Sequence, residues 1–169
     1  IEKAEVQKAF DARKDLARSM AGNAERFLAN RSIDLALQCN YWAYSLIRSL
    51  QDPYELKDAD GNQLIVTLPA RINEILANIS AEYVGRDGDR IDLLFKYKGE
   101  TVSSIEFSYN DGRSECSGAA KDGRGVIEMI PGYTTDTYHL SVDYMGLAQA
   151  TGDADLYSCL LYTSDAADE

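Results

Sequence analysis

The hydrophobic residues of this chain change their spacing once, and this change constrains the fold more than any other feature. Up to about residue 83 they recur every three or four residues, as Ile72, Ile75 and Leu76 do, which indicates helices. After about residue 89 they alternate, as Ile91 and Leu93 do, which indicates half-buried strands. We therefore predict the α+β class, with an N-terminal helical hairpin and a third helix followed by an antiparallel β-sandwich.

Three helices and a short hairpin are expected in the first part of the chain. Residues 2–29 lack proline and are rich in Ala, Glu, Lys and Arg, and residues 33–50 carry apolar side chains at helical spacing. A third helix is predicted over residues 69–83 because proline is favoured in a first helical turn. An Asp-Gly pair between these helices predicts a short β-hairpin at residues 54–66.

These elements suggest a division of the chain into units. Residues 1–84 are expected to form a helical unit that includes the hairpin. Residues 89–146 are expected to form the β-sandwich, because short alternating segments are separated there by Asp-Gly and Pro-Gly turns. Residues 147–158 are interpreted as a linker to a further C-terminal region.

The net charge narrows the classes of partner. Seventeen Lys and Arg residues against 28 Asp and Glu residues give a charge of −11, whereas nucleic acids and anionic membrane surfaces are bound by basic surfaces. Apolar runs are far shorter than the roughly 20 residues of a membrane-spanning helix. We expect no nucleic acid partner and no direct transmembrane segment.

Residues that could carry chemistry are few. His139, the only histidine, alternates with apolar neighbours and is interpreted as an exposed strand residue. Cys39 and Cys116 are interpreted as small hydrophobic residues, although one disulfide or two thiols are both compatible with the sequence. An acidic stretch starting at Asp58 lacks the Gly and Glu that a calcium loop needs at its sixth and twelfth positions. We predict no catalytic residue, cofactor site or metal site.

Aromatic residues are the main candidates for binding. Tyr41, Trp42 and Tyr44 cluster on the second helix and form the predicted interaction surface, since Tyr and Trp are enriched at interfaces. Trp42 is expected to pack inward, and one of the tyrosines to contact the β unit or a partner. Aromatic platforms on a sandwich also bind sugars by stacking, which makes carbohydrate an alternative ligand of four tyrosines, Tyr97, Tyr109, Tyr133 and Tyr144.

Two segments resemble known modules. Ala24, Phe27, Ala36 and Ala43 have the spacing of a tetratricopeptide (TPR) helical hairpin, and residues 20–50 are similar to that family. The turns in Leu94–Val102, Lys121–Val126 and Pro131–Tyr133 resemble those of an immunoglobulin-like module of the carboxypeptidase-regulatory or transthyretin type, over about residues 89–145. The second resemblance implies an immunoglobulin-like sandwich.

The combination of these modules resembles bacterial envelope proteins, which are exported or lipid-anchored. The resemblance implies an extracytoplasmic location, and we expect another protein as the partner. We therefore expect a non-enzymatic envelope or secreted protein that acts as a protein-interaction or scaffolding module. The alternatives are a carbohydrate-binding accessory module and the non-catalytic part of a truncated extracellular enzyme.

The end of the chain, residues 159–169, resembles the translation of a transposase sequencing adapter over its whole length. The resemblance implies that this tail is not native and that the native chain continues differently after Ser158. We therefore expect residues 159–169 to pack poorly, and a chain cut at Ser158 to melt at the same temperature as the full chain.

Overall fold

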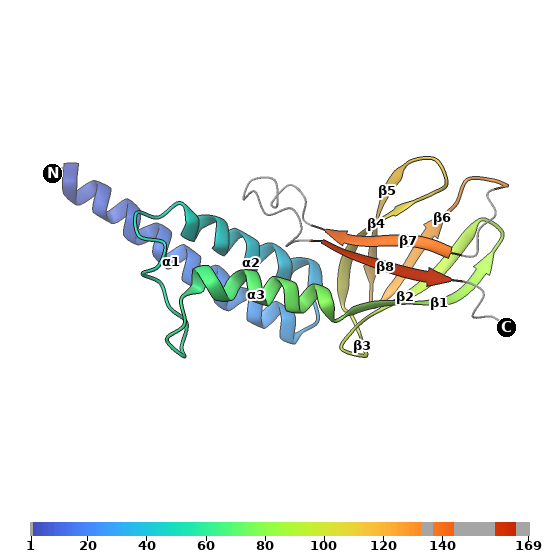
Figure 1. Ribbon diagram of the computed structural model, residues 1–169, viewed down its shortest axis with the longest axis horizontal. Helices are drawn as coiled ribbons and strands as arrows, with labels where there is room; N and C mark the ends of the chain where they lie inside the picture. The colour runs from blue at the N-terminus through green and yellow to red at the C-terminus, as the bar shows by residue number, and fades with distance from the viewer. Residues whose placement is uncertain (1, 133–136, 144–157, 165–169) are drawn as a thin grey trace.

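The computed structural model describes residues 2–132, 137–143 and 158–164. Within these ranges, three helices are followed by one eight-stranded antiparallel sheet, which confirms the α+β class (Figure 1). The helices are α1 (Glu2–Ala29), α2 (Ile33–Arg48) and α3 (Leu64–Ala77). The strands are β1 (Ile79–Asp87), β2 (Arg90–Tyr97), β3 (Glu100–Thr101), β4 (Ser104–Asn110), β5 (Glu115–Lys121), β6 (Arg124–Glu128), β7 (Thr137–Asp143) and β8 (Ser158–Ser164).

The first two helices form an antiparallel hairpin, and α3 lies alongside it (Figure 1). The buried residues of α1 are Ala17, Ala21 and Ala24, whose small side chains allow α2 to approach closely. The N-terminal part of α1 projects beyond the other two helices, and Val6 is exposed there (Figure 1).

The third helix begins and ends earlier than predicted. It runs from Leu64 to Ala77 rather than over residues 69–83, so Pro69 lies inside the helix instead of in its first turn. Asn78 ends it by donating its side-chain amide to the carbonyl of Glu74, 2.7 Å away. The expected unit boundary after residue 84 therefore falls inside β1.

The hairpin predicted at residues 54–66 is reduced to a single bridge between Lys57 and Gln63. Its second arm is wrong because α3 has already begun at Leu64. The predicted turn itself is present, since Gly61 adopts a φ of 82° between the two bridged residues.

The strands follow the order β1-β2-β6-β5-β4-β7-β8, with β3 paired to β2. The sheet curls into a half-barrel whose first and last strands approach each other, an arrangement compatible with the expected sandwich (Figure 1). Its interior is packed tightly around Phe95 and Phe107, whose rings stack with centroids 4.7 Å apart. Gly118 and Gly125 face these rings and leave the space that they occupy.

A seam of polar contacts joins the helical hairpin to the sheet. Arg31, in the α1–α2 turn, donates to the carbonyl of Thr101 at 2.8 Å and pairs with Glu100 at 3.0 Å. The Ser104 hydroxyl donates to the Asp34 carboxylate at 2.5 Å. Buried residues from the helices and the sheet belong to one continuous hydrophobic cluster, so the two parts share a core.

The packing expected of the tail stays a prediction, while the backbone of Ser158–Ser164 forms a strand. These residues lie in β8, which pairs with β7 from Thr137↔Ser164 to Asp143↔Ser158. Without β8, β7 would be the last strand of the sheet, and an exposed edge is a template for a segment of high strand propensity. The linker predicted at residues 147–158 lies outside the described residues except for Ser158.

Candidate functional site

The three predicted aromatic residues do not share one surface. Tyr41 and Tyr44 are 4% and 7% exposed and belong to the core, whereas Trp42 is 53% exposed. The prediction that Trp42 packs inward is therefore wrong. Successive residues of a helix are rotated by about 100°, so Trp42 points away from the side that Tyr41 and Tyr44 share. Burial raises the pKa of the Tyr41 hydroxyl, and a hydrogen bond with Ser45 partly offsets this effect.

Trp42 lies in the middle of an apolar stripe on the outer face of α2. Leu35 is also exposed, and Cys39 and Leu46 are half-buried. These four residues are spaced by four, three and four positions, which places them in one row along a helix. The charged residues of α2 are confined to its ends, with Asp34 in the first turn and Arg48 in the last.

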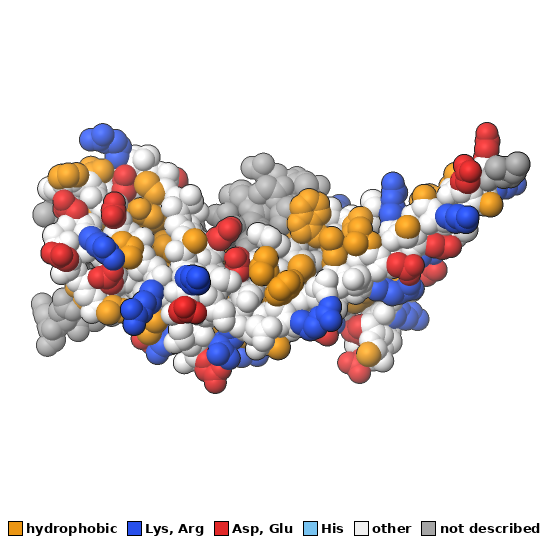
Figure 2. Space-filling model, turned by 180° about the vertical axis from the view of Figure 1, so that it is seen from behind, with side chains coloured by type: hydrophobic (Ala, Val, Ile, Leu, Met, Phe, Trp, Pro, Cys, Tyr) orange, Lys and Arg blue, Asp and Glu red, His pale blue; other side chains and the backbone are white. Residues whose placement is uncertain are grey.

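The neighbouring flank of α1 extends this stripe. Met20 and Phe27 are half-buried. Arg18 and Glu25 of α1 line a pocket together with residues of α3. Met20 follows Arg18 by two positions and Phe27 follows Glu25 by two, which is a rotation of about 200° around the helix axis. They therefore lie on the side of α1 away from α3. Figure 2 shows hydrophobic side chains gathered over the helical part of one face of the molecule. Leu16 of α1 is exposed one turn before Met20. We call the following set the Trp42 surface: Leu16, Met20, Phe27, Leu35, Cys39, Trp42 and Leu46.

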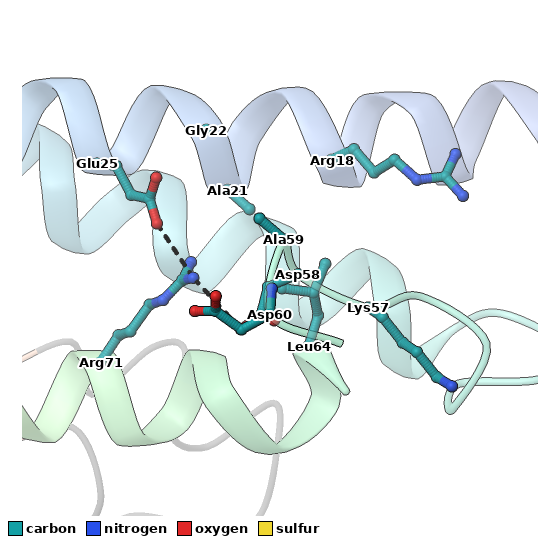
Figure 3. Close-up of a pocket in the computed structure, with 10 residues that line it drawn as sticks. All are labelled: Arg18, Ala21, Gly22, Glu25, Lys57, Asp58, Ala59, Asp60, Leu64 and Arg71. Atoms are coloured by element: carbon teal, nitrogen blue, oxygen red, sulfur yellow. Dashed lines mark hydrogen bonds and ion pairs between the residues drawn. The ribbon is translucent and has the colours of Figure 1, made fainter. Parts of the chain in front are cut away.

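A second, polar site is the cleft between α1 and α3, which has a volume of about 310 Å³ (Figure 3). Arg71 of α3 reaches across it toward Glu25 of α1 at 3.1 Å, and its guanidinium lies 4.0 Å from the Asp58 carboxylate. Lys57 points away from this cluster (Figure 3). The cleft therefore contains charges of both signs that already pair across it.

Asp58 organises the loop that closes one end of this cleft. Its Oδ1 accepts the backbone N–H groups of Asp60 and Asn62, both at 2.9 Å. Oδ1 of Asp58 thus accepts hydrogen bonds within the turn, while Oδ2 faces Arg71. This geometry agrees with the interpretation of the segment as a turn rather than a calcium loop.

The two cysteines outside the tail are free, half-buried thiols, as their interpretation as small hydrophobic residues suggests. Burial raises the pKa of the Cys39 thiol, which disfavours the reactive thiolate. His139 is exposed on β7, opposite Tyr162 of β8, in agreement with the strand position predicted for it.

The tyrosines proposed as a sugar platform do not form one on the described part of the sheet. Tyr97 is buried, and Tyr109 is half-buried with its hydroxyl 3.4 Å from the N–H of Glu128, which donates to it. Tyr133 and Tyr144 lie outside the described residues. Among the helices of the described ranges, none is long and apolar enough to cross a membrane.

The sequence analysis placed Trp42 in the predicted interaction cluster but expected it to face inward, and it did not name the other residues of the Trp42 surface. The signal was present, because Leu35, Cys39, Trp42 and Leu46 form a regular helical row. No family model, curated protein or solved structure matches the chain.

Proposed function

We propose that the protein is a non-enzymatic protein-interaction module that pairs with a second copy of itself through the Trp42 surface. One observation carries this proposal: Trp42 is more than half exposed at the centre of an apolar row on α2. Tryptophan is among the residues that contribute most to binding when an interface removes them from water. Contiguous exposed apolar surfaces commonly mark interaction sites.

The composition of the apolar row supports a second copy as the occupant. The row of Leu35, Cys39, Trp42 and Leu46 carries no charged residue, and Trp42 lies near its middle. A two-fold axis at Trp42 would pair the α2 helices antiparallel and bury the row of each copy against the row of the other. An interface of this kind is self-complementary, as a two-fold symmetric dimer requires.

The proposal is consistent with the TPR-like interpretation of residues 20–50. In helical repeats, one hairpin buries its outer apolar face against the next hairpin. Here α3 covers one side of the α1–α2 hairpin, and a second copy would cover the other. The immunoglobulin-like character of the sheet and the extracytoplasmic location belong to this proposal as well, and they depend on resemblance to bacterial envelope proteins.

Sedimentation velocity of the purified chain tests the proposed pairing. We expect a dimer whose population increases with protein concentration, and a monomer for Trp42→Glu, because a carboxylate at the centre of the interface would be buried without a partner. Val66→Glu is the matched control, since Val66 is also exposed but lies on α3, outside the Trp42 surface. It should dimerise like the wild type.

Circular dichroism should show that both variants are folded, because each replaced side chain is exposed. Leu35→Glu provides an independent check and should weaken the dimer, since it places an unpaired carboxylate in the same apolar row. A wild-type chain that stays monomeric, or a Trp42→Glu variant that dimerises like the wild type, would contradict the proposal.

A further inference from the structure

The N-terminal part of α1 carries two acids on the side of the helix that belongs to the Trp42 surface. We call residues 2–10 of α1 the overhang, because they extend beyond α2 and α3 (Figure 1). Glu2 precedes Met20 by 18 residues, which is five helical turns. Glu5 precedes Leu16 by 11 residues, which is about three turns. Both acids are exposed, and neither forms an ion pair with a residue that the structure describes.

Two cations stand directly opposite each other on the sheet. Lys121 of β5 and Arg124 of β6 are register partners on either side of a tight turn, and we call them the cation pair. Both side chains are exposed, and within the described ranges neither forms an ion pair, with Asp122 of the turn or with another acid. Like charges directly opposite on neighbouring strands repel each other, so this arrangement favours the approach of an anionic group.

The cation pair lies close to the α1–α2 turn and away from α3. The N–H of Asp122 donates to the Ser103 carbonyl at 2.8 Å, and the N–H of Ser103 donates to the carbonyl of Arg31 at 2.8 Å. Strand β1 directly follows α3, and β8 contacts it, whereas β5 and β6 are in the middle of the strand order. The cation pair is therefore on the wall of the half-barrel opposite α3, and the Trp42 surface also faces away from α3.

The proposed dimer brings the overhang of one copy to the sheet of the other. Counted equally from the α1–α2 turn at Arg31, Trp42 is level with Met20, and this turn is about 16 Å from the two-fold axis along the helices. Glu5 and Glu2 are about 22 Å and 27 Å from the axis, in the opposite direction. Because the axis places the partner subunit's turn on the side of the overhang, the two acids pass that turn and reach the sheet beyond it.

We propose that the overhang of each copy docks on the β5–β6 hairpin of the other, where Glu2 and Glu5 face Lys121 and Arg124 of the partner subunit. This inference rests on the proposed pairing through the Trp42 surface and adds a second contact to it. The two sets of charges are complementary in sign and equal in number. The same contact places Val6, which is 54% exposed on the overhang, against the partner subunit.

Reversal of the charges, with rescue, tests this inference by sedimentation equilibrium of the full chain. The overhang variant carries Glu2→Lys and Glu5→Lys, and the hairpin variant carries Lys121→Glu and Arg124→Glu. Each variant should raise the dissociation constant of the dimer about tenfold, because two surface ion pairs become two repulsions. A chain with all four substitutions should return to within about threefold of the wild type, since the pairs are restored with opposite polarity.

The matched control carries Lys57→Glu and Arg113→Glu, which change the net charge as the hairpin variant does but at exposed positions away from the proposed contact. It should dimerise like the wild type. A wild-type chain that stays monomeric would overturn both this inference and the proposed function. A dimer that Trp42→Glu disrupts but the overhang and hairpin variants leave unchanged would overturn this inference alone, and so would a chain with all four substitutions that does not recover.

Discussion

At the scale of single residues, two glycines allow two aromatic rings to pack inside the sheet. A Cβ atom on Gly125 would lie 2.7 Å from the Phe95 ring, and one on Gly118 would lie 2.7 Å from the Phe107 ring. Real Cβ atoms do not approach so closely, so either substitution must displace a buried ring. The stacked rings have little room to move because close-packed cores resist added volume.

Gly125→Ala should therefore destabilise the protein, by about 1–3 kcal/mol, through overpacking. Gly22→Ala is the matched control because a Cβ atom there meets nothing within 4 Å. Gly22 lies in the middle of α1, where alanine should stabilise the helix by about 0.5–1 kcal/mol. Urea denaturation of both variants measures the two changes, and changes of the same sign would contradict this account.

The hydrogen bonds of the Asp111 carboxylate predict how the stability of the folded protein depends on pH. Its Oδ1 accepts the N–H groups of Ser114 at 2.9 Å and Arg113 at 2.8 Å, and these bonds lower the pKa of the carboxyl. A depressed folded-state pKa contributes stability above the unfolded pKa, and this stability is lost as pH falls through the folded pKa. NMR titration should give Asp111 a midpoint below the ordinary value of 3.8.

Asp111→Asn supplies the stability control for this prediction, because asparagine can still accept hydrogen bonds in the turn but does not titrate. The advantage of the wild type over this variant should shrink as the pH falls below about 4. A constant difference between the two proteins across that range would contradict the assigned cause.

The orientation of individual side chains on α2 was not predictable from the sequence. The pattern of α2 correctly predicted a helix beginning at Ile33, but it could not assign the inward face, because apolar residues occur on both sides. Tyr41 and Tyr44 are buried while Trp42 is not, and tertiary contacts with α1 and α3 decide this. The burial of the polar residue Asn40 gave no signal in the sequence, since it depends on how α2 packs in the fold.

At the scale of secondary structure elements, α3 is the main departure from the sequence prediction. Its apolar period continues into β1 because Ile79 and Tyr83 fit both a helical and an alternating pattern. The helix nevertheless ends at Ala77, where β1 begins to pair with β2 from Ile79↔Tyr97 onward. Pairing with the next strand thus overrides the helical period at Ile79 and Tyr83, because those two residues fit both patterns and the period alone does not choose between them.

Pro69 inside α3 gives a prediction at this scale. It has no N–H to donate to the carbonyl four residues earlier, and proline in a helix interior is disfavoured by about 3 kcal/mol relative to alanine. Pro69→Ala should therefore stabilise the protein by about 1–3 kcal/mol. Pro53→Ala, in the preceding loop, should instead destabilise it by less than about 1 kcal/mol. Thermal unfolding that shows a loss of stability for Pro69→Ala would contradict the assignment of α3.

At the scale of the whole molecule, the helices and the sheet are joined by the Arg31 and Asp34 contacts and by one hydrophobic core. We therefore predict one cooperative unfolding transition rather than two. Amide hydrogen exchange should give the most protected residues of α2 and β4 the same free energy of opening, whereas the projecting N-terminal part of α1 should exchange faster. Separate values for α2 and β4 would show that the two parts unfold independently.

The central claim is that Trp42 becomes buried when two copies of the chain meet. Trp42 is the only tryptophan, so the fluorescence of the protein reports directly on its surroundings. We predict that the emission maximum moves to shorter wavelength as the protein concentration rises, with the same midpoint as dimer formation by sedimentation. An emission maximum that stays at the wavelength of solvent-exposed tryptophan at every concentration would contradict the claim.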